Sequence, residues 1–332
     1  MEIKKVLQLT EALILEGLMP FCIELLIEVK WQVSGIKYGI RRNFCKIKES
    51  VQGANSMNSN FGKYNVPHTL QRLTDLQDAL GDPELFLLGF NFYLSLENSR
   101  YFNTPSDVIV FGYIGVDGIH YGFLTDYGSV TDLDEAPIVC ICPMDFDRPT
   151  RIIAKNLCEF LSVNLTDSEL FYNQFDSEEN YLTIRDQWDT EAANSEFQVS
   201  ENEKLVRGRV TKFLMENLQI PTIRNPYHYV QNIELERQRT VSVQTQDGLG
   251  VTTPQLQSEK HIPFPISKDT APNLELLQEY LYSAPVASRL ALFRDIQFNY
   301  VLQDNQELQK IVIDAMINMG LIDEANRLSE DI

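Results

Sequence analysis

The stretch DVIVFGYIGVDGIHYGFLTDY, from Asp107 to Tyr127, decides the fold. Its two halves, Asp107 to Ile114 and Ile119 to Thr125, are rich in β-branched and aromatic residues, which favours strands. Between them, Gly115 to Gly118 supplies glycines, which adopt positive φ readily and suit a tight turn. The stretch therefore predicts a β-hairpin.

Segments on both sides of this hairpin complete an α+β fold. His68 to Leu80 has leucines on one helical face and predicts a helix. Apolar and polar residues alternate in the second half of Leu85 to Leu96, which favours a strand. Pro137 to Cys142 predicts a short buried strand, and Thr150 to Val163 predicts a helix that packs on the sheet. The order helix, mostly antiparallel strands, helix predicts a sandwich of two layers.

The hairpin contains a pattern that resembles the core signature of the SUKH superfamily. The pattern consists of Phe111, Gly112, Gly115, Asp117, Gly118, His120 and Tyr121, with Asp117 at a position where many members have glycine. The resemblance extends over about 66–165 and indicates a divergent member of that group. It implies a SUKH-like α+β fold, in which helices cover a mostly antiparallel sheet. The superfamily includes the yeast Smi/Knr cell-wall regulators and many bacterial immunity proteins that neutralise toxins, often nucleases.

Composition divides the chain into five regions. They are a helical amino-terminal region at 1–50, a linker or long loop at 51–65, the SUKH-like domain at 66–175, an acidic hinge or spacer at 176–199, and a carboxy-terminal α+β and helical region at 200–332. In the last region, Ser200 and Glu203 have capping-box spacing ahead of a helix. Asp247-Gly248 predicts a hairpin turn, and the last sixty or so residues predict a helical bundle.

The amino-terminal region is apolar from Val6 to Val33. Acidic residues and Pro20 interrupt this run before it reaches the ~20 residues that a membrane span needs. Buried helices are the favoured interpretation, and a peripheral membrane hairpin is the alternative. A basic cluster follows at 37–48, which indicates a solvated face, with a role in nucleic-acid binding as the alternative.

The chain as a whole is strongly acidic. Its formal charge of −19 and pI near 4.6 make nucleic acid and anionic membranes poor candidates as partners. Tyr101 to Asp147 contains eight acidic residues and no Lys or Arg. Five carboxylates in predicted turns and loops of this window are expected to be exposed and to bind a protein partner: Asp117, Asp126, Asp132, Asp134 and Glu135. A basic toxin domain would have the complementary charge.

The remaining residues with chemical potential favour structural roles. Cys140 and Cys142 alternate with isoleucine, which indicates two small buried residues rather than a metal or redox pair. Helix capping accounts for Asp145 and Asp147 better than a cation site does. His120 has acidic neighbours in sequence but no serine or cysteine nucleophile, so we expect a hydrogen-bonded structural role. We expect no catalytic residues, no metal and no cofactor.

These observations together predict a non-enzymatic protein-binding module. Five cysteines without a disulfide framework, and no signal peptide, indicate a reducing cytoplasm. The resemblance favours a bacterial immunity-type protein that binds and neutralises a cognate toxin. A regulatory or scaffolding protein of the same fold is the alternative, and an enzyme with an unrecognised site is the second alternative. The sequence leaves the oligomeric state open.

Overall fold

The structure is a computed structural model, and it describes residues 60–97, 99–194, 200–253 and 260–330. The helical prediction for 1–50 and most of the predicted linker at 51–65 lie outside the described residues. Asn60 and Phe61, near the end of that linker, are buried. The described residues all belong to one compact unit, 55–332.

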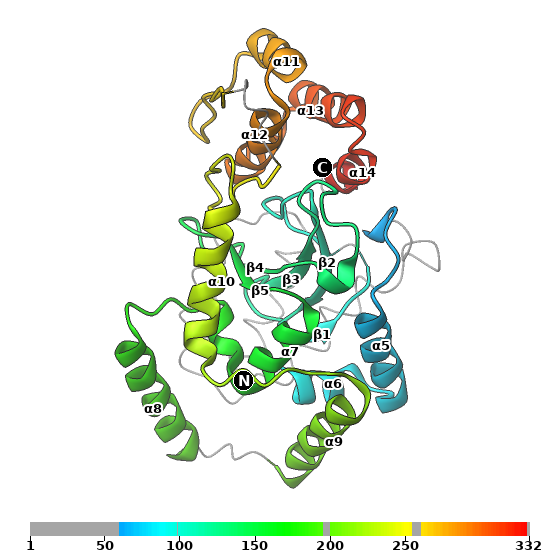
Figure 1. Ribbon diagram of the computed structural model, residues 1–332, viewed down its shortest axis with the longest axis vertical. Helices are drawn as coiled ribbons and strands as arrows, with labels where there is room; N and C mark the ends of the chain where they lie inside the picture. The colour runs from blue at the N-terminus through cyan, green and yellow to red at the C-terminus, as the bar shows by residue number, and fades with distance from the viewer. Residues whose placement is uncertain (1–59, 98, 195–199, 254–259, 331–332) are drawn as a thin grey trace, which may run out of the picture. The chain divides into compact units, whose positions relative to one another are not determined.

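A five-stranded antiparallel sheet forms the centre of this unit, with the strands side by side in sequence order (Figure 1). The strands are β1 (Tyr93–Leu94), β2 (Val108–Tyr113), β3 (His120–Leu124), β4 (Ile138–Ile141) and β5 (Thr150–Ala154). The predicted hairpin is confirmed, because Val108 pairs with Leu124 and Tyr113 pairs with His120. The predicted α+β class is also confirmed.

The segment before the hairpin differs from the prediction. Most of Leu85 to Leu96 is not a strand, because Pro83–Phe90 forms helix α6. The Asp82 side chain accepts a hydrogen bond from the Glu84 N–H, and Pro83 lies in the first turn, so the helix start is well formed. The helix runs on to Phe90, and Asn91 ends it in a left-handed conformation with φ 60°. Of the alternating residues, only Tyr93 and Leu94 therefore pair as β1.

The segment after β4 also differs from the prediction. Thr150 to Val163 is not one helix, because its first five residues pair with β4 as β5. Helix α7 (Leu157–Asp167) begins only after Asn156, whose side chain accepts a hydrogen bond from the Glu159 N–H. Consequently Asp147 caps no helix. The β-branched residues of β5 favour the strand that the prediction missed.

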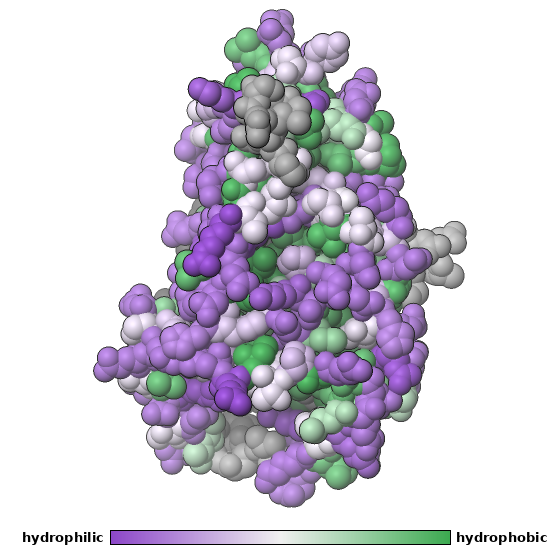
Figure 2. Space-filling model, viewed as in Figure 1, coloured by the Kyte–Doolittle hydropathy of each residue, from purple (hydrophilic) through white to green (hydrophobic). Residues whose placement is uncertain are grey.

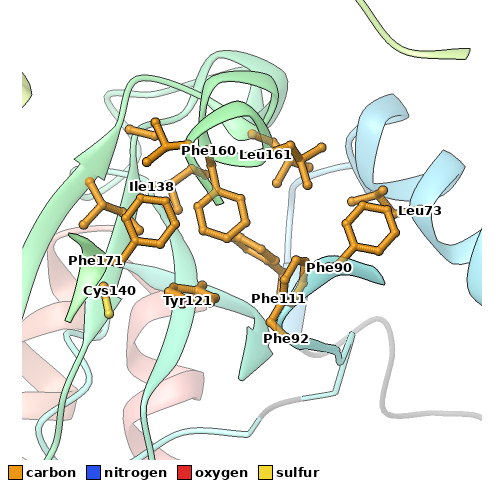
Figure 3. Close-up of a cluster of buried hydrophobic side chains, with 14 of the residues drawn as sticks. Leu73, Phe90, Phe92, Phe111, Tyr121, Ile138, Cys140, Phe160, Leu161 and Phe171 are labelled. Carbon is orange, nitrogen blue, oxygen red and sulfur yellow. The ribbon is translucent and has the colours of Figure 1, made fainter. Parts of the chain in front are cut away.

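One face of the sheet holds an aromatic core beneath α5 (His68–Leu80), α6, α7 and α9 (Glu201–Asn217). The rings converge from β2, β3 and the neighbouring helices in Figure 3. Phe160 of α7 lies 4.9 Å from the Tyr121 ring and 5.6 Å from the Phe111 ring, between ring centroids. These contacts are in the geometry that aromatic pairs prefer. The capping box at Ser200 is confirmed at the start of α9.

The opposite face of the sheet is covered as well. Helix α10 (Pro226–Thr240) packs against it, and Ile233 joins a cluster with Val108, Val139 and Ile152. The prediction of two layers therefore missed a third. β2, β3 and β4 are buried on both faces, which fits their nearly continuous apolar sequences.

The rest of the described chain is mainly helical, and the predicted helical end is confirmed. The remaining helices are the short 3₁₀ turns Leu133–Glu135 and Ser168–Phe171, α8 (Glu178–Asn194), α11 (Leu274–Ser283), α12 (Val286–Phe298), α13 (Gln306–Asn318) and α14 (Ile322–Glu330). No helix in the described ranges has both the length and the apolar character needed to cross a bilayer. Figure 2 shows a mostly hydrophilic face with small hydrophobic groups, as the composition leads one to expect.

Candidate protein-binding groove at the hairpin end of the sheet

The antiparallel order sends the acidic window to two opposite ends of the sheet. The β2–β3 turn and the β4–β5 loop lie at one end, and they contain Asp117, Asp145 and Asp147. The β3–β4 connection lies at the other end, and it contains Asp126, Asp132, Asp134 and Glu135. Strands of five residues separate the two ends by about 16 Å. The acidic window is continuous in sequence, but its loop carboxylates therefore lie on two separate surfaces of the fold.

At the far end, the prediction that Asp126 is exposed is wrong. Its side chain is buried, and Oδ1 accepts hydrogen bonds from Arg237 Nη2 at 2.6 Å and Arg294 Nη2 at 3.3 Å. Burial opposes ionisation, but the hydrogen bonds and charge of Arg237 hold the pKa of Asp126 below its usual value. Both arginines lie more than a hundred residues away in sequence, so no local pattern indicated this pairing.

The other three predicted carboxylates at the far end differ from one another. Asp132 and Glu135 are exposed, as predicted. Asp134 is half-buried and accepts hydrogen bonds from the backbone N–H groups of His68 at 3.1 Å and Thr69 at 3.3 Å. Pro67 occupies the N-cap position of α5 and offers no side-chain cap. Asp134 therefore caps α5 from a distant part of the sequence.

At the hairpin end, a groove of about 760 Å³ opens beside the β2–β3 turn. Its lining residues are Ile114, Val116, Asp117, Ile119, Cys142, Met144, Asp145, Phe146, Asp147, Tyr172 and Asn173. Three of the apolar ones are exposed: Phe146 at 66%, Met144 at 55% and Val116 at 37%. Asp117 and Asp147 are exposed beside them, and neither forms an ion pair with another described residue. The groove therefore combines apolar contact area with unpaired negative charge.

Asp145 fixes the loop that forms one wall of the groove. Its Oδ1 accepts a hydrogen bond from the Arg148 N–H at 3.0 Å, and its Oδ2 accepts one from Arg151 Nη2 at 2.8 Å. Burial works against ionisation, yet these donors lower the pKa of Asp145 below its usual value. Arg148 forms an ion pair with Glu234 of α10. Asp145, Arg148 and Arg151 are thus engaged internally, which leaves Asp117 and Asp147 for a partner.

The hairpin turn forms the opposite wall. Ile114 N–H and Ile119 N–H close it with hydrogen bonds of 3.0 Å to Ile119 O and Val116 O. Gly118 has φ +69°, and a Cβ at this position would lie 2.6 Å from the Tyr101 ring. The glycine is therefore needed both for the backbone conformation and for the close approach of the ring.

His120 lies behind this turn and has the hydrogen-bonded role that the sequence predicted. Its Nδ1 lies 2.7 Å from Gly118 O, and its Nε2 lies 3.0 Å from Thr104 Oγ1. Burial lowers the pKa of His120 to about 4, so the ring is neutral at pH 7. Since Gly118 O can only accept, Nδ1 donates and Nε2 accepts from the Thr104 hydroxyl. His120 therefore braces the turn.

The residues of the SUKH-like pattern have clear structural places. Phe111 and Tyr121 are fully buried in the aromatic core. A Cβ on Gly112 would lie 2.6 Å from the Phe92 ring and 2.9 Å from Tyr93 O, so only glycine fits there. Gly115 has φ +77° in the turn. Packing and backbone conformation account for all four residues.

The exposed apolar residues of the groove were not among the predicted site residues. Met-Asp-Phe-Asp at 144–147 alternates apolar and acidic residues in a loop, and this unusual pattern was the available signal. No three His, Cys, Asp or Glu side chains in the described ranges come together as metal ligands would.

Comparison with known proteins adds no family to this picture. No family model matches the chain, and no curated protein matches it. The SUKH resemblance therefore stays a prediction from the sequence.

Proposed function

We propose that this chain is a non-enzymatic protein-binding module whose groove binds a cationic protein. The observation that supports this most is the juxtaposition of Phe146 and Met144 with the unpaired carboxylates of Asp117 and Asp147. Exposed apolar side chains provide the buried contact area of an interface, and aromatic and Met residues are enriched there. The carboxylates favour a positively charged partner and accelerate its association.

The walls of the groove are held in place before any partner arrives. Asp145 ties its loop to Arg151, and the hairpin turn is closed by two backbone hydrogen bonds. A partner that docks there need not order these segments, so less of the interaction free energy is lost on binding. This preorganisation supports binding at the groove rather than at the far end, where the described β3–β4 connection, 125–137, has no exposed large apolar side chain.

The partner that the sequence resemblance favours is a toxin domain, and the chain would then be a bacterial immunity-type protein. A nuclease toxin carries a basic surface for phosphate, which is complementary to the groove. A regulatory or scaffolding protein of the same fold is the second candidate. The described helices α11 to α14, which pack mainly in a hydrophobic cluster of their own, favour it because they offer further surface for partners.

Affinity capture with two matched variants tests the proposal. Asp117→Asn/Asp147→Asn neutralises the groove, and Asp132→Asn/Glu135→Gln removes the same charge at the far end. We expect the wild type and the far-end variant to retain a basic protein that the groove variant loses. The proposal is overturned if the groove variant retains every specific partner, or if only the far-end variant loses one.

The apolar contribution is tested separately with Phe146→Ala. Tyr282→Ala is the matched control, because Tyr282 is also exposed but lies on α11. We expect Phe146→Ala to weaken capture by at least about tenfold, as for an interface hot spot, and Tyr282→Ala to leave it unchanged. Stoichiometric inhibition of the captured protein's activity would favour an immunity function, and binding without inhibition would favour a regulatory one.

A further inference from the structure

Two cysteine sulfurs lie close together at the floor of the groove. Cys140 Sγ and Cys142 Sγ are 3.8 Å apart. Cys140 is fully buried in the core beneath α7, whereas Cys142 follows the last residue of β4 and lines the groove. Cys142 is only 5% exposed, so it meets the groove at its floor, and Cys140 lies directly behind it.

The surroundings make the two thiols unequal. The hydrogen bond from Cys140 lowers the pKa of Cys142, and the Arg151 guanidinium lowers it further, while burial, Asp145 and Asp117 oppose the shift. Burial raises the pKa of Cys140 well above its usual value. These directions favour ionisation of Cys142, the sulfur nearer to the Arg151 guanidinium and the groove, while either sulfur can donate in the 3.8 Å contact between them. This resembles the pairing of thiols in reactive dithiol sites, where the accessible thiolate is the nucleophile.

We propose that Cys142 is a peroxide-reactive thiol and that Cys140 is its resolving partner. The Cys142 thiolate attacks one oxygen of hydrogen peroxide, the O–O bond breaks, and the hydroxide that leaves takes up a proton to become water. The Cys140 sulfur then attacks the Cys142 sulfenic acid, the S–O bond breaks, and a second water leaves with the Cys140 proton. Two thiols are oxidised to one disulfide, and one peroxide is reduced to two waters. This inference does not rest on the proposed function.

The disulfide requires the end of β4 to move. The sulfurs must approach from 3.8 Å to about 2.05 Å. Cys142 must shift more than Cys140, because Cys140 is paired within β4 whereas Cys142 lies beyond its paired residues. The shift strains or breaks two backbone hydrogen bonds, from Cys142 N–H to Pro149 O and from Asp145 N–H to the Cys142 carbonyl. Moving Cys142 displaces the loop that carries Met144 and Phe146. Thiol–disulfide exchange with a reductant reverses such a bond, so the modification is reversible.

Cys158 provides an internal control. This thiol on α7 is more exposed than Cys142 and lies 3.8 Å from the Thr69 hydroxyl. Burial raises the pKa of Cys158, and the nearby acidic residues add to the shift. Exposure alone predicts that Cys158 oxidises before Cys142. The proposed pairing predicts the reverse order.

The experiment treats the reduced full-length protein with hydrogen peroxide and maps each cysteine by mass spectrometry over time. We expect a Cys140–Cys142 disulfide, seen as a loss of about 2 Da in one peptide, to form at least about tenfold faster than Cys158 oxidises. Dithiothreitol should restore both thiols. In Cys140→Ser, Cys142 should accumulate as a sulfenic acid that dimedone traps, with Cys158 unchanged.

Either of two results would overturn the inference. One is oxidation of Cys158 before Cys142 in the wild-type protein. The other is oxidation of Cys142 directly to sulfinic acid in the wild type, without a disulfide to Cys140. Both are read from the wild-type chain, so the test holds even where Cys140→Ser does not fold.

Discussion

Arg294 is the buried cation that joins α12 to the central sheet. Its side chain is 0% exposed, with Nη2 at 2.6 Å from Asp107 Oδ2 and Nη1 at 2.7 Å from Gly250 O. Asp107 is equally buried, and its Oδ1 has no hydrogen-bond partner among the residues that the structure describes. Burial raises the pKa of Asp107, and the charge of Arg294 opposes that rise. The carboxylate therefore depends on this one guanidinium.

Arg294→Met keeps the apolar stem and removes the charge. It leaves Asp107 as an uncompensated buried group, which costs about 3–5 kcal/mol in comparable buried pairs. The loss cannot exceed the cost of protonating Asp107, because the neutral acid no longer needs a cation beside it. In Arg294→Met/Asp107→Leu both charges are gone, so at least about 2 kcal/mol of the loss should be recovered. This loss is a large share of the 5–15 kcal/mol that is typical for a folded unit.

Urea unfolding of the full-length protein measures these differences. The matched control is Arg289→Met on the same helix, because Arg289 is only half-buried and its Nη1 donates to Leu281 O at 3.2 Å. The control should cost about 0.5–1.5 kcal/mol, as one net hydrogen bond does. Equal losses for the two single variants, or strictly additive losses in the double variant, would refute the reasoning.

Three further predictions concern stability and are measured by the same unfolding experiment. Asp134→Ala should cost about 0.5–2 kcal/mol because it removes the cap of α5, whereas Glu135→Ala should change stability by less than about 0.5 kcal/mol; equal effects would argue against the cap. Gly118→Ala should cost at least about 1 kcal/mol more than Gly248→Ala, because both have positive φ but only Gly118 faces a ring; similar losses would argue against that contact. Burial raises the pKa of Asp295 to about 6, so the folded state binds this proton more tightly than the unfolded chain does. The stability that this proton provides is complete below the unfolded pKa and is lost as pH rises through about 6. Asp295→Asn keeps the acceptor oxygen and avoids the buried charge, so it should raise the free energy of unfolding by up to about 3 kcal/mol at pH 8. Below pH 4 this increase should vanish, and an increase that does not depend on pH would contradict the prediction.

The hairpin could be predicted from sequence because its determinants are local. β-branched and aromatic residues in β2 and β3, and glycines at 115 and 118, specify two strands and a turn without help from the rest of the chain. The helical end was predicted for the same reason, since helical periodicity is local. Boundaries were harder where two local signals compete. Thr150–Ala154 and Leu157–Asp167 are both apolar, and the Asn156 cap that separates them was overlooked.

The site was harder to predict because it depends on which strand ends meet. Asp117 and Asp132 are close in sequence but lie at opposite ends of the sheet. Asp126 is a loop residue by pattern, yet Arg237 and Arg294 from distant helices enclose it. Local periodicity in the sequence does not reveal which distant residues form such ion pairs. The Met-Asp-Phe-Asp run was visible, but its exposure follows only from the position of the loop beyond β4.

The most direct test of the groove is the association rate of the captured partner, purified and measured at low and high salt. With wild-type protein the rate should fall steeply between about 50 mM and 500 mM salt, because charges beyond about 8 Å are screened at physiological ionic strength. Asp117→Asn/Asp147→Asn should associate at least about tenfold more slowly at low salt and should approach the wild-type rate at high salt. An unchanged rate and salt dependence in this variant, while it remains folded, would contradict the claim that the groove attracts a cationic partner.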